Sequence, residues 1–431
     1  MKDYIIKLKK NKLINNIIIL LNGNIIASII SMINVSILVH NIGLELNGVL
    51  FIAQAYANLF NDLFNFQSFE SIIKFVPIYL NKNRNKVISY INQGFLLDFI
   101  TALIAFLVGL IALKPLSIFM KWNYEVEICA FIYIVVILFK VTGTSIGVLR
   151  IFDKFKFTVY ITLLECILRF IIYIIGFYIN AGIVFYAIGD LIISIISISV
   201  LIFLTYITLK EKGLNKFSKK YTRIDKEFLK FNIFTNIQLT LDMPVRNLTP
   251  FIINKYLGLS DIAVYKIIEK IGSIVSKITM PISVALSPNI SEKIASGNFN
   301  DAIKTHKKII KIISLIGTCL IIILYISHNL WIDLFIPQTK TNIIALFLYF
   351  IYLIYINCFM AQHSIFIYAG YIKYSIIIVL VSNIIYMGIL ILFSIKYGII
   401  GVVVARIIQS TMIFLFKGII LNLKRDSYVI I

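Results

Sequence analysis

The sequence has few charged residues for its size. Only 14% of its 431 residues are charged and 60% are hydrophobic, whereas a soluble domain carries about 25% charged residues. A water-soluble globule of this composition would expose too much apolar surface, and disorder is excluded because there is ample apolar material to bury. Apolar runs of about 20 residues, long enough for a helix to cross a bilayer, recur along the whole chain. The composition therefore predicts an all-α polytopic membrane protein.

Several chemical motifs are missing as well. The four cysteines are scattered through apolar runs, and there is no CxxC or His/Cys spacing, so we expect neither a metal site nor a disulfide framework. No Walker motif is present, which argues against direct use of ATP. No loop carries a Ser/His/Asp, DxD or paired-carboxylate pattern, so we expect a protein that is not an enzyme and that uses no cofactor.

The apolar runs predict twelve spans, and the basic residues orient them. Of the 41 lysines and arginines, 29 fall in the termini and loops of one side and 5 on the other. The positive-inside rule then places both termini in the cytoplasm. The net charge of +21 is thus mainly a topological signal and does not indicate nucleic-acid binding. The expected spans are 14–38, 46–66, 91–113, 128–149, 157–179, 183–208, 228–254, 259–287, 309–327, 342–368, 372–394 and 398–421.

A weak internal repeat divides the chain. The run AGIVFYAIGDLIISI (181–195) aligns with YGIIGVVVARIIQST (397–411) at an offset of 216, which pairs Asp190 with Arg406. The run IGLELNGVLF (42–51) aligns with LGLSDIAVYK (257–266) at an offset of 215. Parallel repeats of this kind are typical of transporters with a substrate site between the halves. We therefore expect two pseudo-symmetric six-helix lobes, 1–208 and 228–431, joined by a basic cytoplasmic linker at 209–227.

Three segments carry a resemblance to a known family. The run from Leu257 to Ala302, with its Leu-Gly, Tyr-Lys pair and proline-terminated helix, resembles the seventh and eighth helices of Wzx-type polysaccharide flippases. NFQSFESIIKFVPIYLNKNRNK and GVLRIFDKFKF are similar to the corresponding element of the first half and to that family's fourth loop. The chain departs from the family at Thr249, where an acid is often found. Its own acid, Asp242, lies two turns earlier.

The resemblance implies a MATE-like exporter of the bacterial inner membrane, in which two lobes rock around a central cavity. Its cargo would be an oligosaccharide linked to undecaprenyl diphosphate, such as an O-antigen or capsule repeat unit, moved to the periplasmic leaflet. Coupling to H⁺ or Na⁺ and contact with polysaccharide polymerase or assembly proteins would follow. Two alternatives stay open: a drug or metabolite antiporter of the same superfamily, and a polysaccharide polymerase or ligase.

Charges within predicted spans mark candidate sites, because charge inside a membrane is costly. Basic residues outnumber acids there, which suits a diphosphate and not a hydrophobic cation. Glu165 and Arg169, and Asp242 and Arg246, could instead form ion pairs at i,i+4, and Lys266 and Lys270 could snorkel to the interface. The matched Asp190 and Arg406 are expected to face each other across the lobes. Cargo-binding candidates are Lys140, Arg169, Arg246, Lys270, Lys277 and Arg406, and ion-coupling candidates are Glu165, Asp190, Asp242 and Glu269.

Overall fold

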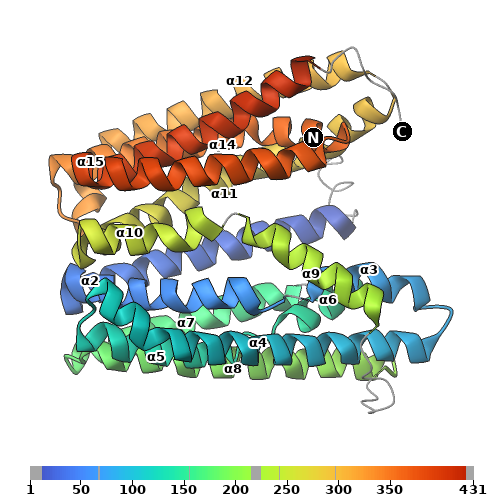
Figure 1. The fold of residues 1–431 in the computed structure, drawn as a ribbon, viewed down its shortest axis with the longest axis horizontal. Helices are drawn as coiled ribbons and strands as arrows, with labels where there is room; N and C mark the ends of the chain where they lie inside the picture. The colour runs from blue at the N-terminus through green and yellow to red at the C-terminus, as the bar shows by residue number, and fades with distance from the viewer. Residues whose placement is uncertain are drawn as a thin grey trace. The chain divides into compact units, whose positions relative to one another are not determined.

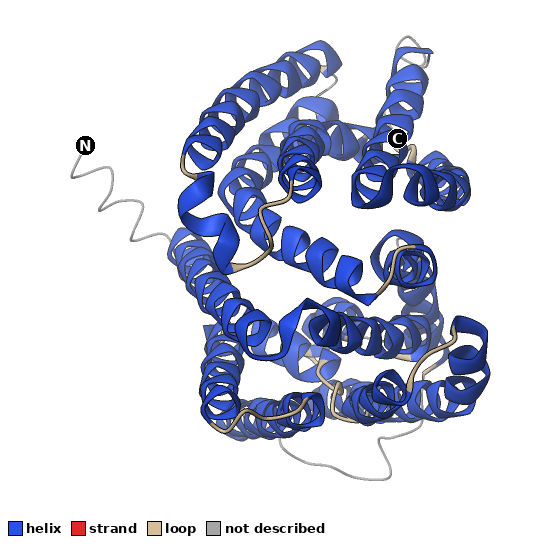
Figure 2. Ribbon diagram, turned by 90° about the vertical axis from the view of Figure 1, so that its left-hand side faces the viewer, coloured by secondary structure: helices blue, strands red, loops and turns tan. Residues whose placement is uncertain are grey.

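The chain is helical throughout the part that the structure describes. The computed structural model contains no strand in these residues (Figure 2), which confirms the predicted all-α fold. Seven of the described helices are long and apolar enough to cross a membrane on their own. The described residues are 12–66, 68–154, 156–214, 225–241, 243–296 and 298–423.

The chain divides into two compact units, and the first is Met1–Met243. Within it, α2 packs against α5 and α7, α4 packs against α5, and α7 packs against α8 (Figure 1). Its described helices are α2 (Lys12–Phe64), α3 (Phe69–Tyr79), α4 (Arg84–Met120), α5 (Tyr124–Ile137), α6 (Gly143–Ile151), α7 (Lys156–Tyr178), α8 (Ile183–Glu211) and α9 (Lys226–Thr240).

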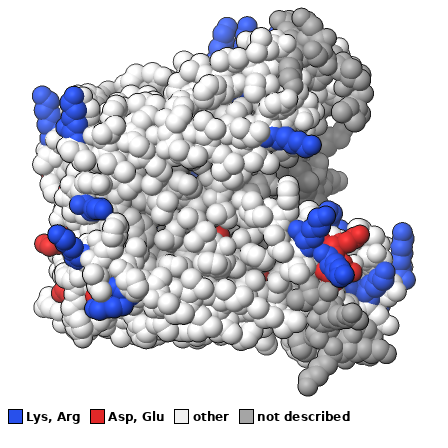
Figure 3. Space-filling view, in the orientation of Figure 1, with Lys and Arg blue, Asp and Glu red and all other residues white. Residues whose placement is uncertain are grey.

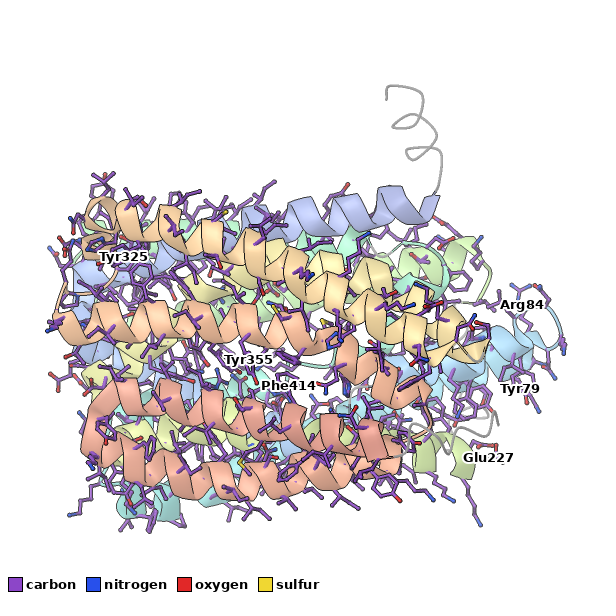
Figure 4. All side chains as sticks on the ribbon, turned by 90° about the horizontal axis from the view of Figure 1, so that it is seen from above. Tyr79, Arg84, Glu227, Tyr325, Tyr355 and Phe414 are labelled. Carbon is purple, nitrogen blue, oxygen red and sulfur yellow. The ribbon has the colours of Figure 1, made fainter. Side chains whose placement is uncertain are left out.

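The second unit is Pro244–Ile431. Its centre is α14, which packs against α11, α12 and α15. Tyr355 of α14 and Phe414 of α15 lie side by side, with ring centroids 5.5 Å apart (Figure 4). The described elements are the π-helix η2 (Pro244–Leu248), α10 (Thr249–Tyr256), α11 (Leu259–Ala295), α12 (Phe299–Ile326), α13 (His328–Trp331), the short 3-10 helix η3 (Ile332–Leu334), α14 (Lys340–Tyr368) and α15 (Ile372–Leu423).

Glycine kinks separate neighbouring spans inside the two longest helices. In α2 the kink is at Gly43 (φ 75°), between the predicted spans 14–38 and 46–66. In α15 it is at Gly398 (φ 59°), where the last predicted span begins. A positive φ is readily accessible only to glycine, because it has no Cβ. Each of these long helices therefore corresponds to two of the predicted spans.

Two predicted spans are broken instead of continuous. The span 128–149 consists of α5 and α6, with residues 138–142 between them. The span 228–254 consists of α9, the π-helix and α10. Irregular backbone at membrane depth is tolerated where protein side chains satisfy its polar groups. The polar neighbours of these breaks are therefore candidates for functional residues.

The division between the units falls at Met243/Pro244, and not in the predicted linker 209–227. The helix α9, which we expected in the second half, packs against α2 and α3 of the first unit. Asn236 of α9 donates to the carbonyl oxygen of Leu63 at 3.0 Å. Within the predicted linker, the carbonyl of Gly213 accepts from Arg84 Nε of the same unit at 3.1 Å. The physical reason is the break between α9 and α10, which separates the packing of the two halves of this span. Residues 215–224 of the linker lie outside the described residues.

The surface fits a bilayer. On the face shown in Figure 3, Lys and Arg gather near the two ends of the helices, and the surface between them is almost entirely uncharged. Large apolar side chains such as Ile111 (75% exposed) and Ile384 (73%) point outward. In a membrane these side chains contact lipid tails and so carry no solvation penalty.

Candidate functional site

A buried carboxylate organises the first unit. Asp190 of α8 accepts from Arg169 Nε of α7 at 2.7 Å and from the Tyr133 hydroxyl of α5 at 2.6 Å. Gln54 Nε2 of α2 is 3.4 Å from the same carboxylate. Four helices therefore meet at one charge, and the side chain of Asp190 is only 6% exposed. These donors satisfy a carboxylate that would be costly to bury without partners.

A buried guanidinium plays the equivalent part in the second unit. Arg406 Nη1 of α15 donates to Glu269 Oε1 of α11 at 2.9 Å and to the Tyr349 hydroxyl of α14 at 3.1 Å. Its Nη2 donates to the carbonyl oxygen of Val245 in the π-helix at 3.3 Å. Glu269 also accepts from Lys266, its neighbour at i,i+3, at 2.8 Å. Lys266 therefore forms an ion pair, which replaces the snorkelling alternative.

The two networks are copies of one another with the charge reversed. Each consists of an amide or carboxylate, a tyrosine hydroxyl and a central charge, and corresponding residues are 215 or 216 positions apart, as in the predicted repeat. The pairs are Gln54 with Glu269, Tyr133 with Tyr349, and Asp190 with Arg406. The repeat thus extends from sequence into side-chain contacts.

The expectation that Asp190 and Arg406 face each other across the lobes stays a prediction, because the contacts described for each residue lie within one unit. Each is buried and bonded inside its own unit. Each has complementary groups on neighbouring helices of its own unit, which satisfy a buried charge without a partner elsewhere. The local pairing of Glu165 with Arg169 is displaced, because the guanidinium of Arg169 turns to Asp190.

Lys140 lies at the break between α5 and α6. Its ammonium donates to Asn58 Oδ1 at 2.7 Å, and its carbonyl oxygen accepts from Asn65 Nδ2 at 3.2 Å. Asp62 and Glu165 lie close enough to attract the ammonium electrostatically. The unwound backbone and the lysine are thus held by polar side chains of α2, which positions a cation inside a span.

Asp98 of α4 supports the same region. Its Oδ1 accepts from the backbone N–H of Ser68 at 3.0 Å, and its Oδ2 accepts from the N–H (2.7 Å) and hydroxyl (2.8 Å) of Thr144. These donors stand at the starts of α3 and α6. One carboxylate therefore satisfies the N-termini of two helices, where negative charge is favourable. Asp98 lies in the predicted span 91–113, so the rule that intramembrane charge marks a site applies to it, and our candidates omitted it.

The remaining candidates differ in exposure. Arg246 of the π-helix is exposed, and Lys270 and Lys277 of α11 are partly buried. Asp242 lies outside the described residues, so its pairing with Arg246 stays a prediction. Within the described ranges, no group of three His, Cys, Asp or Glu could hold a metal ion.

Comparison with known families decides the classification. The profile of the polysaccharide biosynthesis protein family matches residues 13–294, which is more than half of the chain. The chain belongs to this family. A second profile, that of the MatE family, matches residues 243–392. No curated protein matches the chain significantly.

Solved structures share the fold of this polysaccharide biosynthesis protein. Lipid II flippase MurJ, in an inward closed conformation, is 16% identical with a TM-score of 0.72, over 94% of this chain and 87% of that one. An inward-facing multidrug resistance MATE family transporter of the MOP superfamily is 15% identical with a TM-score of 0.71, over 93% and 96%. A MATE protein crystallised with a ligand has a TM-score of 0.64 at 15% identity, over 95% of each chain. Family and fold together support a multi-pass membrane transporter or flippase, consistent with the Wzx-type resemblance.

Proposed function

We propose that the protein is a flippase that moves an oligosaccharide linked to undecaprenyl diphosphate from the cytoplasmic to the periplasmic leaflet of the bacterial inner membrane. The observation that carries this proposal is the match to the polysaccharide biosynthesis family across the first lobe and into the second. Both termini lie in the cytoplasm, and the lobes alternate access to the cargo. O-antigen and capsule repeat units are the cargo class, with a polymerase and assembly proteins as partners.

The cargo diphosphate contacts a subset of the predicted cations. Arg169 and Arg406 already have buried carboxylate partners, so their charge is largely compensated. Lys140, Arg246, Lys270 and Lys277 keep part of their side chains accessible and supply the positive charge. A diphosphate stripped of water needs such charge-assisted donors.

Coupling to a proton or sodium gradient uses acids that are not committed to an ion pair. Asp190 and Glu269 are each held by an arginine in one of the two networks, so a coupling ion would have to compete with that ion pair. Glu165, which lies outside both arginine ion pairs, is therefore the stronger coupling candidate among the described acids, and Asp242 stays a candidate from its sequence position alone. Flipping that persists in vesicles after H⁺ and Na⁺ gradients are collapsed would contradict coupling.

A second candidate function is export of a drug or metabolite cation, which the MatE profile match over residues 243–392 favours. The net positive charge of the candidate cargo residues argues against it, because cations repel a cationic cargo.

Two measurements separate the functions. The first is restoration of surface polysaccharide in a strain that lacks its own flippase. The second is movement of a fluorescent short-chain undecaprenyl-diphosphate oligosaccharide in vesicles that contain the purified protein. Resistance to cationic drugs without movement of this lipid would overturn the flippase proposal in favour of the antiporter.

A further inference from the structure

The π-helix η2 contains a carbonyl that its own helix cannot satisfy. In a π-helix the carbonyl of residue i accepts from the N–H of residue i+5. For Val245 that residue is Pro250, which has no N–H. An unpaired buried carbonyl is costly, and most of all inside a bilayer, where water cannot replace the missing donor.

Two side chains supply the missing donor. Arg406 Nη2 of α15 donates to the Val245 carbonyl at 3.3 Å, and the Thr249 hydroxyl donates to the same oxygen at 2.9 Å. Thr249 is in turn held by the Tyr386 hydroxyl at 2.7 Å. Thr249 is fully buried and Arg406 is 7% exposed, whereas Val245 itself is partly buried.

The same residues would bond differently in an α-helical register. There the Val245 carbonyl would accept from the N–H of Thr249, and it would need no side chain. The carbonyl left without a donor would be that of Arg246, whose i+4 partner is Pro250. In either register, Pro250 leaves one carbonyl without a backbone donor: that of Val245 in the π-helix and that of Arg246 in an α-helix. The guanidinium of Arg406 bonds the Val245 carbonyl, which is the one that lacks a backbone donor in the π-helical register.

We propose that Arg406 is a positioning residue that replaces the amide N–H missing at Pro250 and thereby selects the π-helical register of Pro244–Leu248. The guanidinium reaches Val245 with Nη2 and Glu269 with Nη1, so the two contacts use different nitrogens and can be removed separately. The π-helix begins at Pro244, the first residue of the second unit, so its register fixes how α10 enters that unit. The inference concerns this helix alone and does not depend on the cargo.

A second-site test follows from the chemistry. Arg406→Ala removes the donor, whereas Pro250→Ala restores an N–H to the backbone. We expect R406A to shift the unfolding equilibrium in detergent by roughly tenfold or more, because the Val245 carbonyl keeps only the Thr249 hydroxyl and Glu269 loses its arginine. The R406A/P250A double variant should recover the part of that loss that belongs to the carbonyl. If R406A does not fold, R406K, which keeps the charge on a shorter side chain with a single donor group, replaces it in the same pair of measurements.

A matched control separates the effect of losing the Val245 contact from the effect of losing the ion pair. Glu269→Gln removes the same ion pair and leaves Arg406 able to reach Val245. Pro250→Ala should therefore not rescue E269Q. Equal rescue of E269Q and R406A would overturn the proposal, because it would show that P250A stabilises the protein in general. Failure to rescue either arginine variant would also overturn it.

A distance measurement distinguishes register selection from simple stabilisation. Spin labels at Ile237 of α9 and Tyr256 of α10, both exposed, measure the distance across the π-helix in a background without native cysteines. We expect R406A to change the distribution of distances and E269Q to change it less. A distribution that R406A leaves unchanged would assign Arg406 a merely structural role and overturn the proposal.

Discussion

Replacing Asp98 by asparagine tests whether one carboxylate holds two broken helices together. The carboxylate accepts three hydrogen bonds, from the N–H of Ser68 and from the N–H and hydroxyl of Thr144. Asparagine keeps one acceptor oxygen but turns the other position into an NH₂ group that meets a backbone donor. One helix start therefore loses its partner, and both lose the favourable charge at their N-termini.

The magnitude follows from these contacts. A hydrogen bond to a charged group contributes about 1.5–3 kcal/mol, and a charge at a helix N-terminus about 0.3–1 kcal/mol. With one such bond lost and two helix termini affected, we expect D98N to lower the free energy of unfolding by about 2–5 kcal/mol. Asp98 is only 1% exposed, so solvent does not weaken these contacts.

The assay is reversible unfolding of the purified protein in mixed micelles with SDS, followed by tryptophan fluorescence. Glu45→Gln is the matched control, because it neutralises the charge of an exposed carboxylate in the same unit. E45Q should stay within about 0.5 kcal/mol of the wild type, as an exposed substitution usually does. If D98N matched E45Q, the carboxylate would not be a helix cap and the reasoning would fail.

Three further substitutions test other parts of the structure. Lys140→Ala should abolish the surface polysaccharide restored by the wild type while membrane abundance, measured by immunoblot, stays unchanged; full restoration would remove Lys140 from the cargo site. Asp190→Asn should destabilise the protein by about 1.5–3 kcal/mol in the same SDS assay, because Arg169, whose side chain is 28% exposed, loses its carboxylate partner. Adding Arg169→Met should recover part of the loss. Gly398→Ala should lower the free energy of unfolding by about 1–2 kcal/mol, because Gly398 has a positive φ. Gly388→Ala should not lower it, because Gly388 lies in ordinary helix with open space where a Cβ would be added. Equal effects of the two substitutions would mean that the kink does not need glycine.

Much of the fold was predictable because it depends on local composition. Span boundaries follow apolar runs, so α8 and α14 begin within two residues of the predicted positions. The internal repeat was also visible in the sequence, and its offset matches Tyr133 with Tyr349, which occupy equivalent places in the two networks. Applying that offset to every polar residue of the spans is the signal that would have added both tyrosines to the candidates.

The partners of buried charges were harder to predict. The sequence spacing offered Glu165 as an ion-pair partner of Arg169, since the two lie one turn apart on one helix. In the structure Arg169 pairs instead with Asp190 of another helix. The boundary between the units also differs from the predicted linker, since it falls at Met243/Pro244, after α9. A span that is broken in the middle can pack its two parts against different units. Neither result follows from spacing along one helix.

The sequence alone determined the class of the protein, the number of its spans and its twofold repeat. These properties follow from the cost of exposing apolar surface to water and of placing charge in lipid, and both costs can be counted residue by residue. Tertiary structure decided which helices meet. Only there do Asp190 and Arg406 become the centres of two charge-reversed networks, and only there does a guanidinium reach the carbonyl that Pro250 leaves unpaired. Such contacts join residues far apart in the chain, so their energies are set by packing and not by local pattern.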